Sequence, residues 1–91
     1  MQQPIYERAR DLMEAELGEE LVALDPVGGE CFGFNGVAAT VWRLLERPST
    51  AADLKRSLLL EYDVDPARCD AELDELLGDM VNRGLVRFLH D

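Results

Sequence analysis

Hydrophobic and polar positions divide the chain into a strand region followed by a helical region. Short apolar runs separated by turn residues predict an antiparallel meander in the first third of the chain. The turn after Asp25-Pro26, with Gly28 and Gly29, has the flexible backbone that a hairpin between the last two strands requires. The three predicted strands span residues 12–17, 21–24 and 31–34.

Apolar residues then recur at intervals of three and four, which predicts three amphipathic helices. Capping signals place their starts: Asn35 is a good N-cap, Thr50 with Asp53 forms a capping box, and Asp65 precedes a proline at the first helical position. Gly84 can adopt the left-handed conformation that ends a helix. The predicted helices run from Asn35 to before Pro48, from Thr50 to Tyr62 and from Pro66 to Asn82.

Together these elements predict one α+β domain over residues 12–89 with a winged helix-turn-helix architecture: an N-terminal antiparallel three-stranded meander followed by three helices. Residues 85–89 are expected to pack as an extended tail. Residues 1–11 are polar, and we expect a flexible N-terminus there. A chain of 91 residues suits a single domain with one modest core.

The composition is that of a soluble globular protein with a strong acidic excess. The formal net charge is −10, from 19 acidic and 9 basic residues. Nucleic acid and anionic membrane surfaces are therefore poor partners. No apolar run approaches the length of a membrane span, and the N-terminus has no signal-peptide pattern. We expect a cytoplasmic protein.

The candidate catalytic groups do not assemble into a site. The single histidine, His90, is the penultimate residue, and we expect it to be exposed. Cys31 and Cys69 are too few and too far apart for a disulfide framework or a zinc site, so both are expected to be free thiols. No phosphate-binding glycine motif is present. The sequence therefore predicts no enzyme activity, no cofactor and no metal.

DNA binding by a winged-helix regulator is the alternative that the predicted fold suggests. The third helix would have to enter the major groove beside phosphates. From Asp65 to Arg83 the chain has six acidic and two basic residues. This segment would repel the backbone that DNA-binding proteins contact through Lys and Arg.

Peptide binding fits the pattern of strands and acidic residues better than DNA binding does. The strand at 31–34 comes last in the meander, so its backbone groups can lie at a sheet edge and accept an extended peptide as an added strand. The competing interpretation is a short, protected edge. The third helix would supply a second wall, with Asp70, Asp74 and Gly78 on one flank and Ala71 further round. The sequence leaves open which flank faces the strand.

The order of motifs resembles the PqqD family, the small precursor-peptide recognition elements of ribosomally synthesised, post-translationally modified peptide pathways. The resemblance covers roughly residues 12–89, and no single motif is very specific. The matching positions are Leu21-Val22-Ala23-Leu24-Asp25, Gly29-x-Cys31-Phe32-x-Phe34-Asn35, Ala39-x-Val41-Trp42-x-Leu44-Leu45, Thr50-x-x-Asp53-Leu54, Tyr62-Asp63-Val64 and Leu76-x-x-x-Met80-Val81-x-x-Gly84-Leu85-Val86.

This resemblance implies a binding module without catalysis, as in pyrroloquinoline quinone and lasso peptide biosynthesis. Such a module holds the leader region of a precursor peptide between the third strand and the third helix, and presents it to a leader peptidase, cyclase or radical SAM enzyme. Phe34 replaces a more usual aliphatic residue, so its ring is expected in the core. A scaffold that binds mainly the enzyme is a third possibility. The candidate peptide-binding residues are Glu30, Cys31, Phe32, Gly33, Phe34, Asp70, Ala71, Asp74, Leu77, Gly78 and Val81.

Overall fold

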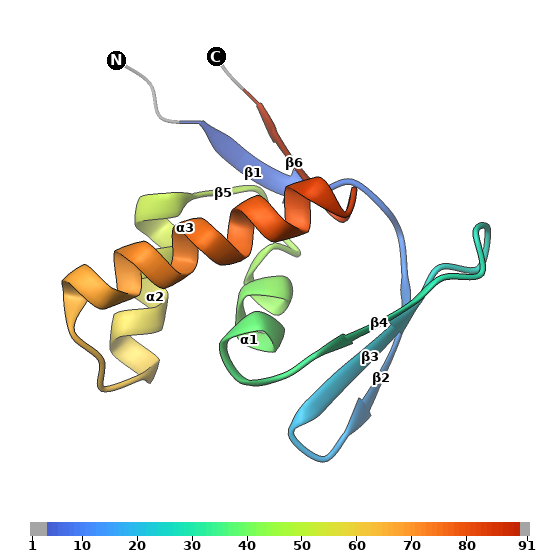
Figure 1. Ribbon diagram of the computed structural model, residues 1–91, viewed down its shortest axis with the longest axis horizontal. Helices are drawn as coiled ribbons and strands as arrows, with labels where there is room; N and C mark the ends of the chain where they lie inside the picture. Colours follow the sequence, from blue (N-terminus) through green and yellow to red (C-terminus); the bar gives the residue numbers. More distant parts are fainter. Residues whose placement is uncertain (1–3, 90–91) are drawn as a thin grey trace.

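The computed structural model describes residues 4–89, and His90 therefore lies outside the described residues. Two three-stranded antiparallel sheets and three helices make up an α+β fold (Figure 1). The predicted fold class and the order of meander before helices are confirmed. The winged helix-turn-helix architecture stays a prediction.

The predicted meander is present as the sheet β2-β3-β4. Its strands are β2 (Met13–Leu17), β3 (Glu20–Leu24) and β4 (Cys31–Phe34). Gly29 adopts a φ of +75° in the β3–β4 connection, which is why a glycine is needed there. Alternate residues of β3 and β4 face the core, so Leu21 and Ala23 pack beside Phe34 and Phe32.

A second sheet brings the two ends of the chain together. Strand β1 (Ile5–Arg8) pairs with both β5 (Ser49–Thr50) and β6 (Val86–Leu89). A flexible N-terminus is expected over residues 1–11, but residues 5–8 form the central strand of this sheet; residues 1–3 lie outside the described residues. The predicted extended tail is one of its partners. Pairing between segments so distant in sequence leaves no local signal at either one.

The three helices begin where the capping signals predict. They are α1 (Gly36–Leu44), α2 (Ala51–Glu61) and α3 (Pro66–Asn82). The side chains of Thr50 and Asp65 accept hydrogen bonds from backbone N–H groups at the third helical position, as N-caps do. Asn35 occupies the N-cap of α1 without a side-chain bond. Gly84 ends α3 with a φ of +72°.

The core lies between the inner face of the β2-β3-β4 sheet and the three helices. Trp42 of α1 is its largest fully buried side chain, and its ring stacks on that of Phe34 with 5.3 Å between the centroids. The helical pattern alone places Trp42 at the edge of the apolar stripe of α1. It is buried because the inner face of the sheet covers the flank of α1 that the helical pattern alone leaves open.

Candidate functional site

Strand β4 lies at the edge of its sheet and has β3 as its one neighbour there. Phe32 and Phe34 point into the core, whereas Cys31 and Gly33 are exposed. The alternation follows the two-residue period of a strand. The two rings therefore fix the position of β4, while its free side remains open.

The backbone of Cys31 and Gly33 faces this open edge. The N–H of Asp25 donates to the carbonyl of Glu30 at 2.8 Å, so these two opposed residues form a hydrogen-bonded pair. In an antiparallel ladder such pairs alternate with pairs whose backbone groups point away from each other. With this register, the backbone N–H and C=O groups of Phe32 and Phe34 point toward β3, and those of Cys31 and Gly33 point outward.

Arg10 ties the start of β4 to the end of α3. Its guanidinium donates to the Glu30 carboxylate at 2.7 Å and to the Gly84 carbonyl at 3.0 Å. The same group lies 5.8 Å from the centroid of the Phe32 ring. One arginine thus holds the strand, the hairpin and the helix end together, with charge-assisted bonds that are stronger than neutral ones.

At the other end, β4 runs into α1, whose first turn lines a pocket that α3 also lines. Val37 of α1 lines a small apolar pocket together with Leu73 and Glu72 of α3. Glu72 shares this pocket with Val37, and Gly84 and Glu30 both accept from the guanidinium of Arg10, so the flank of α3 between Glu72 and Gly84 lies toward β4. Helical spacing places Leu76, Asp79 and Arg83 on this flank, which we call the β4-facing flank with Glu72 included.

The β4-facing flank combines a half-buried apolar side chain with paired charges. Leu76 packs against the core while remaining partly exposed. Asp79 pairs with Arg83 at 3.2 Å, and Glu72 pairs with Arg68 at 2.9 Å. The open backbone of β4 offers hydrogen bonds, and this flank of α3 offers side-chain contacts.

Comparison with known families decides the classification. The sequence profile described as Coenzyme PQQ synthesis protein D (PqqD) matches residues 20–86. The chain belongs to the PqqD family. The match spans β3 to the first residue of β6 and so contains β4 and all of α3. No curated protein matches the sequence.

Two solved structures resemble this PqqD family member over nearly all of its length. The first is described as TbiB1 in complex with the TbiA(beta) leader peptide; it has 25% identity and a TM-score of 0.78, and covers 93% of this chain and 99% of its own. The second is a lasso peptide synthetase B1 complexed with the leader peptide, with 24% identity, a TM-score of 0.72, and coverage of 90% and 96%.

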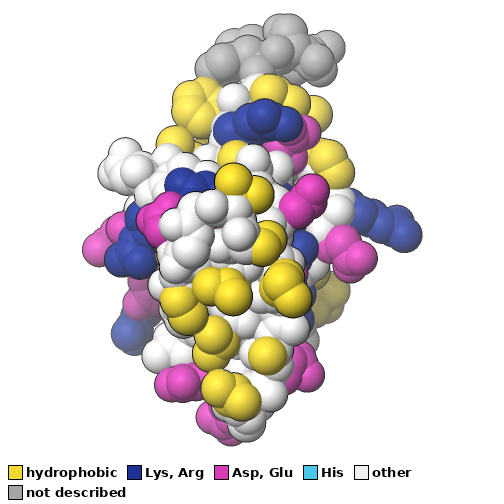
Figure 2. Space-filling view, turned by 90° about the vertical axis from the view of Figure 1, so that its right-hand side faces the viewer, with side chains coloured by type: hydrophobic (Ala, Val, Ile, Leu, Met, Phe, Trp, Pro, Cys, Tyr) yellow, Lys and Arg dark blue, Asp and Glu magenta, His cyan; other side chains and the backbone are white. Residues whose placement is uncertain are grey.

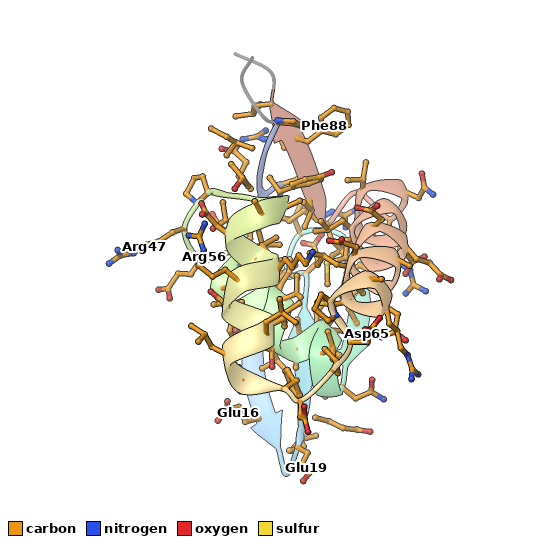
Figure 3. All side chains as sticks on the ribbon, turned by 90° about the vertical axis from the view of Figure 1, so that its left-hand side faces the viewer. Glu16, Glu19, Arg47, Arg56, Asp65 and Phe88 are labelled. Carbon is orange, nitrogen blue, oxygen red and sulfur yellow. The ribbon has the colours of Figure 1, made fainter. Side chains whose placement is uncertain are left out.

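The helix residues predicted from sequence lie on the opposite flank of α3. Asp70 pairs with Lys55 of α2 at 2.8 Å. Asp74, Gly78 and Val81 line a hollow with Tyr6 and Phe88 of the β1–β6 pair. In Figure 3, Phe88 lies at the far end of the molecule from Glu19, which marks the β2–β3 turn.

The two remaining helix candidates have other positions. Leu77 belongs to the buried core, and Ala71 is exposed on the outer side of α3. The strand candidates Glu30 to Phe34 do lie together on β4 and at its start. Sequence reasoning did not single out Glu72, Leu76 and Asp79, because helical spacing treats the two flanks of α3 as equivalent and the β1–β6 pair beside Asp74 and Gly78 was not predicted.

The described residues hold no cluster suited to a metal. Among residues 4–89 no three His, Cys, Asp or Glu side chains converge in a way that could bind an ion. Both cysteines are free, Cys31 exposed and Cys69 buried. No helix in the same range is long and apolar enough to span a membrane.

Asp25 stabilises the hairpin that carries β4, and this contribution depends on pH. Hydrogen bonds from the backbone N–H groups of Gly28 and Val27, together with the Arg10 guanidinium, lower the pKa of Asp25 from its usual 3.8. A carboxylate with a depressed pKa stabilises the fold above its unfolded pKa, and this stabilisation is lost as the pH falls through the folded value.

Replacing Asp25 with asparagine should therefore lower the urea midpoint at pH 7, where the ion pair with Arg10 is intact. The difference between wild type and Asp25→Asn should shrink as the pH falls below 3.8, because the wild-type carboxyl then also becomes neutral. Urea titrations at pH 7 and at successive values below 4 measure this. A difference independent of pH would contradict the assignment.

Proposed function

We propose that this protein binds the leader region of a ribosomally synthesised precursor peptide and presents it to a maturation enzyme, without catalysing a step itself. The leader adds to β4 as an antiparallel strand, in the groove with the β4-facing flank of α3. The observation that carries the proposal is the open edge of β4, with the backbone groups of Cys31 and Gly33 directed outward.

The two similar structures support this proposal, because each is described as a complex with a leader peptide. Family membership supports it independently of structure. The enzyme that receives the peptide would be a leader peptidase, a cyclase or a radical SAM enzyme, and the pair would act in the cytoplasm. The net charge of −10 favours a leader or a partner enzyme that carries basic residues.

Calorimetric titration with the leader segment of the precursor from the same gene cluster tests the proposal. Micromolar or tighter binding is expected, and the absence of heat at tens of micromolar would contradict it. The protein without peptide should also leave the electrophoretic mobility of duplex DNA unchanged at physiological salt.

The choice of flank can be tested with two matched substitutions in α3. Leu76 and Val81 are both half-buried apolar residues packed against the core, but they lie on opposite flanks. Leu76→Asp should weaken leader binding by about tenfold or more, because it places a charge on the apolar wall of the groove. Val81→Asp should leave the affinity within about twofold of the wild type.

The reverse pattern, with Val81→Asp weakening binding and Leu76→Asp leaving it intact, would assign the groove to the flank with Asp70, Asp74 and Gly78. Both variants lose a similar apolar contact with the core, so their thermal midpoints should fall by similar amounts. Comparing the affinities of the two variants therefore separates a binding effect from a folding effect.

A further inference from the structure

Arg10, in the segment between β1 and β2, connects the start of β4 to the end of α3. The main packing partners of β4 are β3 and α1, whereas α3 packs chiefly against α2 and β6. A leader strand on the open edge of β4 would contact both β4 and the β4-facing flank of α3. The spacing between these two surfaces therefore matters for the fit of the peptide, and Arg10 bonds to both sides.

Each nitrogen of the Arg10 guanidinium has an acceptor. At the end of α3, Nε donates to the Gly84 carbonyl at 3.0 Å and Nη2 donates to the Arg83 carbonyl at 3.3 Å. On the hairpin side, Nη1 donates to the Asp25 carboxylate at 3.0 Å and to the Glu30 carboxylate at 2.7 Å. We call these four contacts the Arg10 bridge. The last carbonyls of a helix lack partners within the helix and carry the negative end of its dipole, so a cation is favourable there.

The chain around Arg10 is fixed on both sides. The N–H of Ala9 donates to the Leu85 carbonyl at 2.9 Å, just beyond α3, and Leu12 packs against the core. A Cβ at Gly84 would lie 3.0 Å from Nη2 of Arg10, so the absence of a side chain there lets the guanidinium reach the end of the helix. The Arg10 side chain is thus held in one conformation, as a positioning role requires.

The charge of Arg10 is balanced within the Arg10 bridge, because the guanidinium faces the carboxylates of both Asp25 and Glu30. Figure 2, which views the side from which the β3–β4 hairpin projects, shows basic side chains lying among acidic ones. Long-range attraction of a peptide by Arg10 is therefore small. What the Arg10 bridge supplies is geometry: a planar group with donors on two sides, which a lysine does not reproduce.

We propose that Arg10 is a positioning residue for leader binding, because the Arg10 bridge sets the spacing between the edge of β4 and the β4-facing flank of α3; this rests on the proposed function. An antiparallel leader strand would leave β4 beside Cys31, the residue that follows Glu30. Without the Arg10 bridge, the start of β4 and the end of α3 move independently, and the leader has to order them when it binds. Linkage then requires that bound leader stabilises the Arg10 bridge by the same factor.

Titration calorimetry with the leader segment of the precursor from the same gene cluster compares three variants with the wild type. Arg10→Met and Arg10→Lys should each weaken leader binding by about tenfold, since lysine keeps the charge but cannot bond to the hairpin and the helix end together. The matched control is Arg8→Met. Arg8 also donates to a carboxylate and to a backbone carbonyl, but these belong to Glu14 and Trp42, outside β4 and α3. Its loss should leave the leader affinity within about twofold at temperatures well below every thermal midpoint.

Hydrogen exchange at the Arg10 Nε–H, followed by NMR in the wild type, gives a readout that a merely structural role would not change and that needs no variant to fold. Saturating leader should slow this exchange by about tenfold.

Exchange that stays as fast with leader as without it would overturn the proposal. So would wild-type leader affinity in Arg10→Met or Arg10→Lys, or an equal loss of affinity in Arg8→Met, which would assign the effect to general stability. Failure of the wild type to bind leader would instead contradict the proposed function and the role of Arg10 with it, whereas the other results concern Arg10 alone.

Discussion

Replacing Gly33 with proline is expected to reduce leader binding by ten- to a hundredfold. Proline removes the outward backbone N–H at the centre of β4, and its ring occupies the line along which the peptide would approach. A peptide carbonyl left without a partner at this position costs about 1–3 kcal/mol. The fold should survive, because proline is tolerated on edge strands where its nitrogen faces away from the ladder. Calorimetric titration measures the loss.

Gly33→Ala is the matched control for this substitution. A Cβ at Gly33 has open space around it, and alanine keeps the N–H, so leader affinity should stay close to that of the wild type. Loss of binding in both variants would indicate that the space above Gly33, rather than its hydrogen bond, is what the peptide needs. Binding unchanged by Gly33→Pro would contradict strand addition at β4.

Trp42→Ala is expected to cost about 3–5 kcal/mol of folding stability, the usual range for deleting a large buried aromatic side chain. Trp42 is fully buried, stacks on Phe34 of β4 and bonds to Glu14 of β2, so it connects α1 to both outer strands of the sheet. This loss is a large part of the ~5–15 kcal/mol that stabilises a typical domain. Urea unfolding followed by circular dichroism measures it.

Leu60→Ala provides the comparison for Trp42→Ala. Its side chain is exposed on α2, so its removal should change the free energy of unfolding by about 0.5 kcal/mol or less. A loss below about 1 kcal/mol for Trp42→Ala would show that the sheet and α1 are not held together through this indole. Leader binding by Trp42→Ala is expected to weaken as β4 loses its support.

The elements with local signals could be predicted from the sequence. Thr50 and Asp65 cap helices with their own side chains, and Gly84 ends α3. Each of these features depends only on residues a few positions away in the chain. The hairpin between β3 and β4 is equally local. The edge position of β4 also followed from order alone, since it is the last strand of a meander.

The parts of the fold that the sequence did not predict depend on contacts between remote segments. β1 pairs with β6, at the opposite end of the chain, and no property of residues 5–8 alone indicates this. The β1–β6 pair lies beside the flank of α3 that carries Asp74 and Gly78, and the sequence does not reveal this contact. Helical periodicity identifies the buried stripe of α3 but treats its two flanks as equivalent.

Contacts between remote segments also determine which side chains of β2 face inward. The sequence predicts a strand from residue 12 to residue 17, but its apolar residues would normally be assigned to the core. They face solvent because Glu14 and Glu16 have inward partners on α1 and β1, which only the folded chain brings together. The inward direction of Glu14 and Glu16 is therefore visible only in the structure.

Amide hydrogen exchange, followed by NMR with and without saturating leader, tests the central claim most directly. In the free protein the amides of Phe32 and Phe34 should be protected by β3, while those of Cys31 and Gly33 exchange rapidly. Strand addition predicts that leader binding slows exchange at Cys31 and Gly33. Exchange at these two amides that stays as fast with bound leader as without it would contradict binding at the edge of β4.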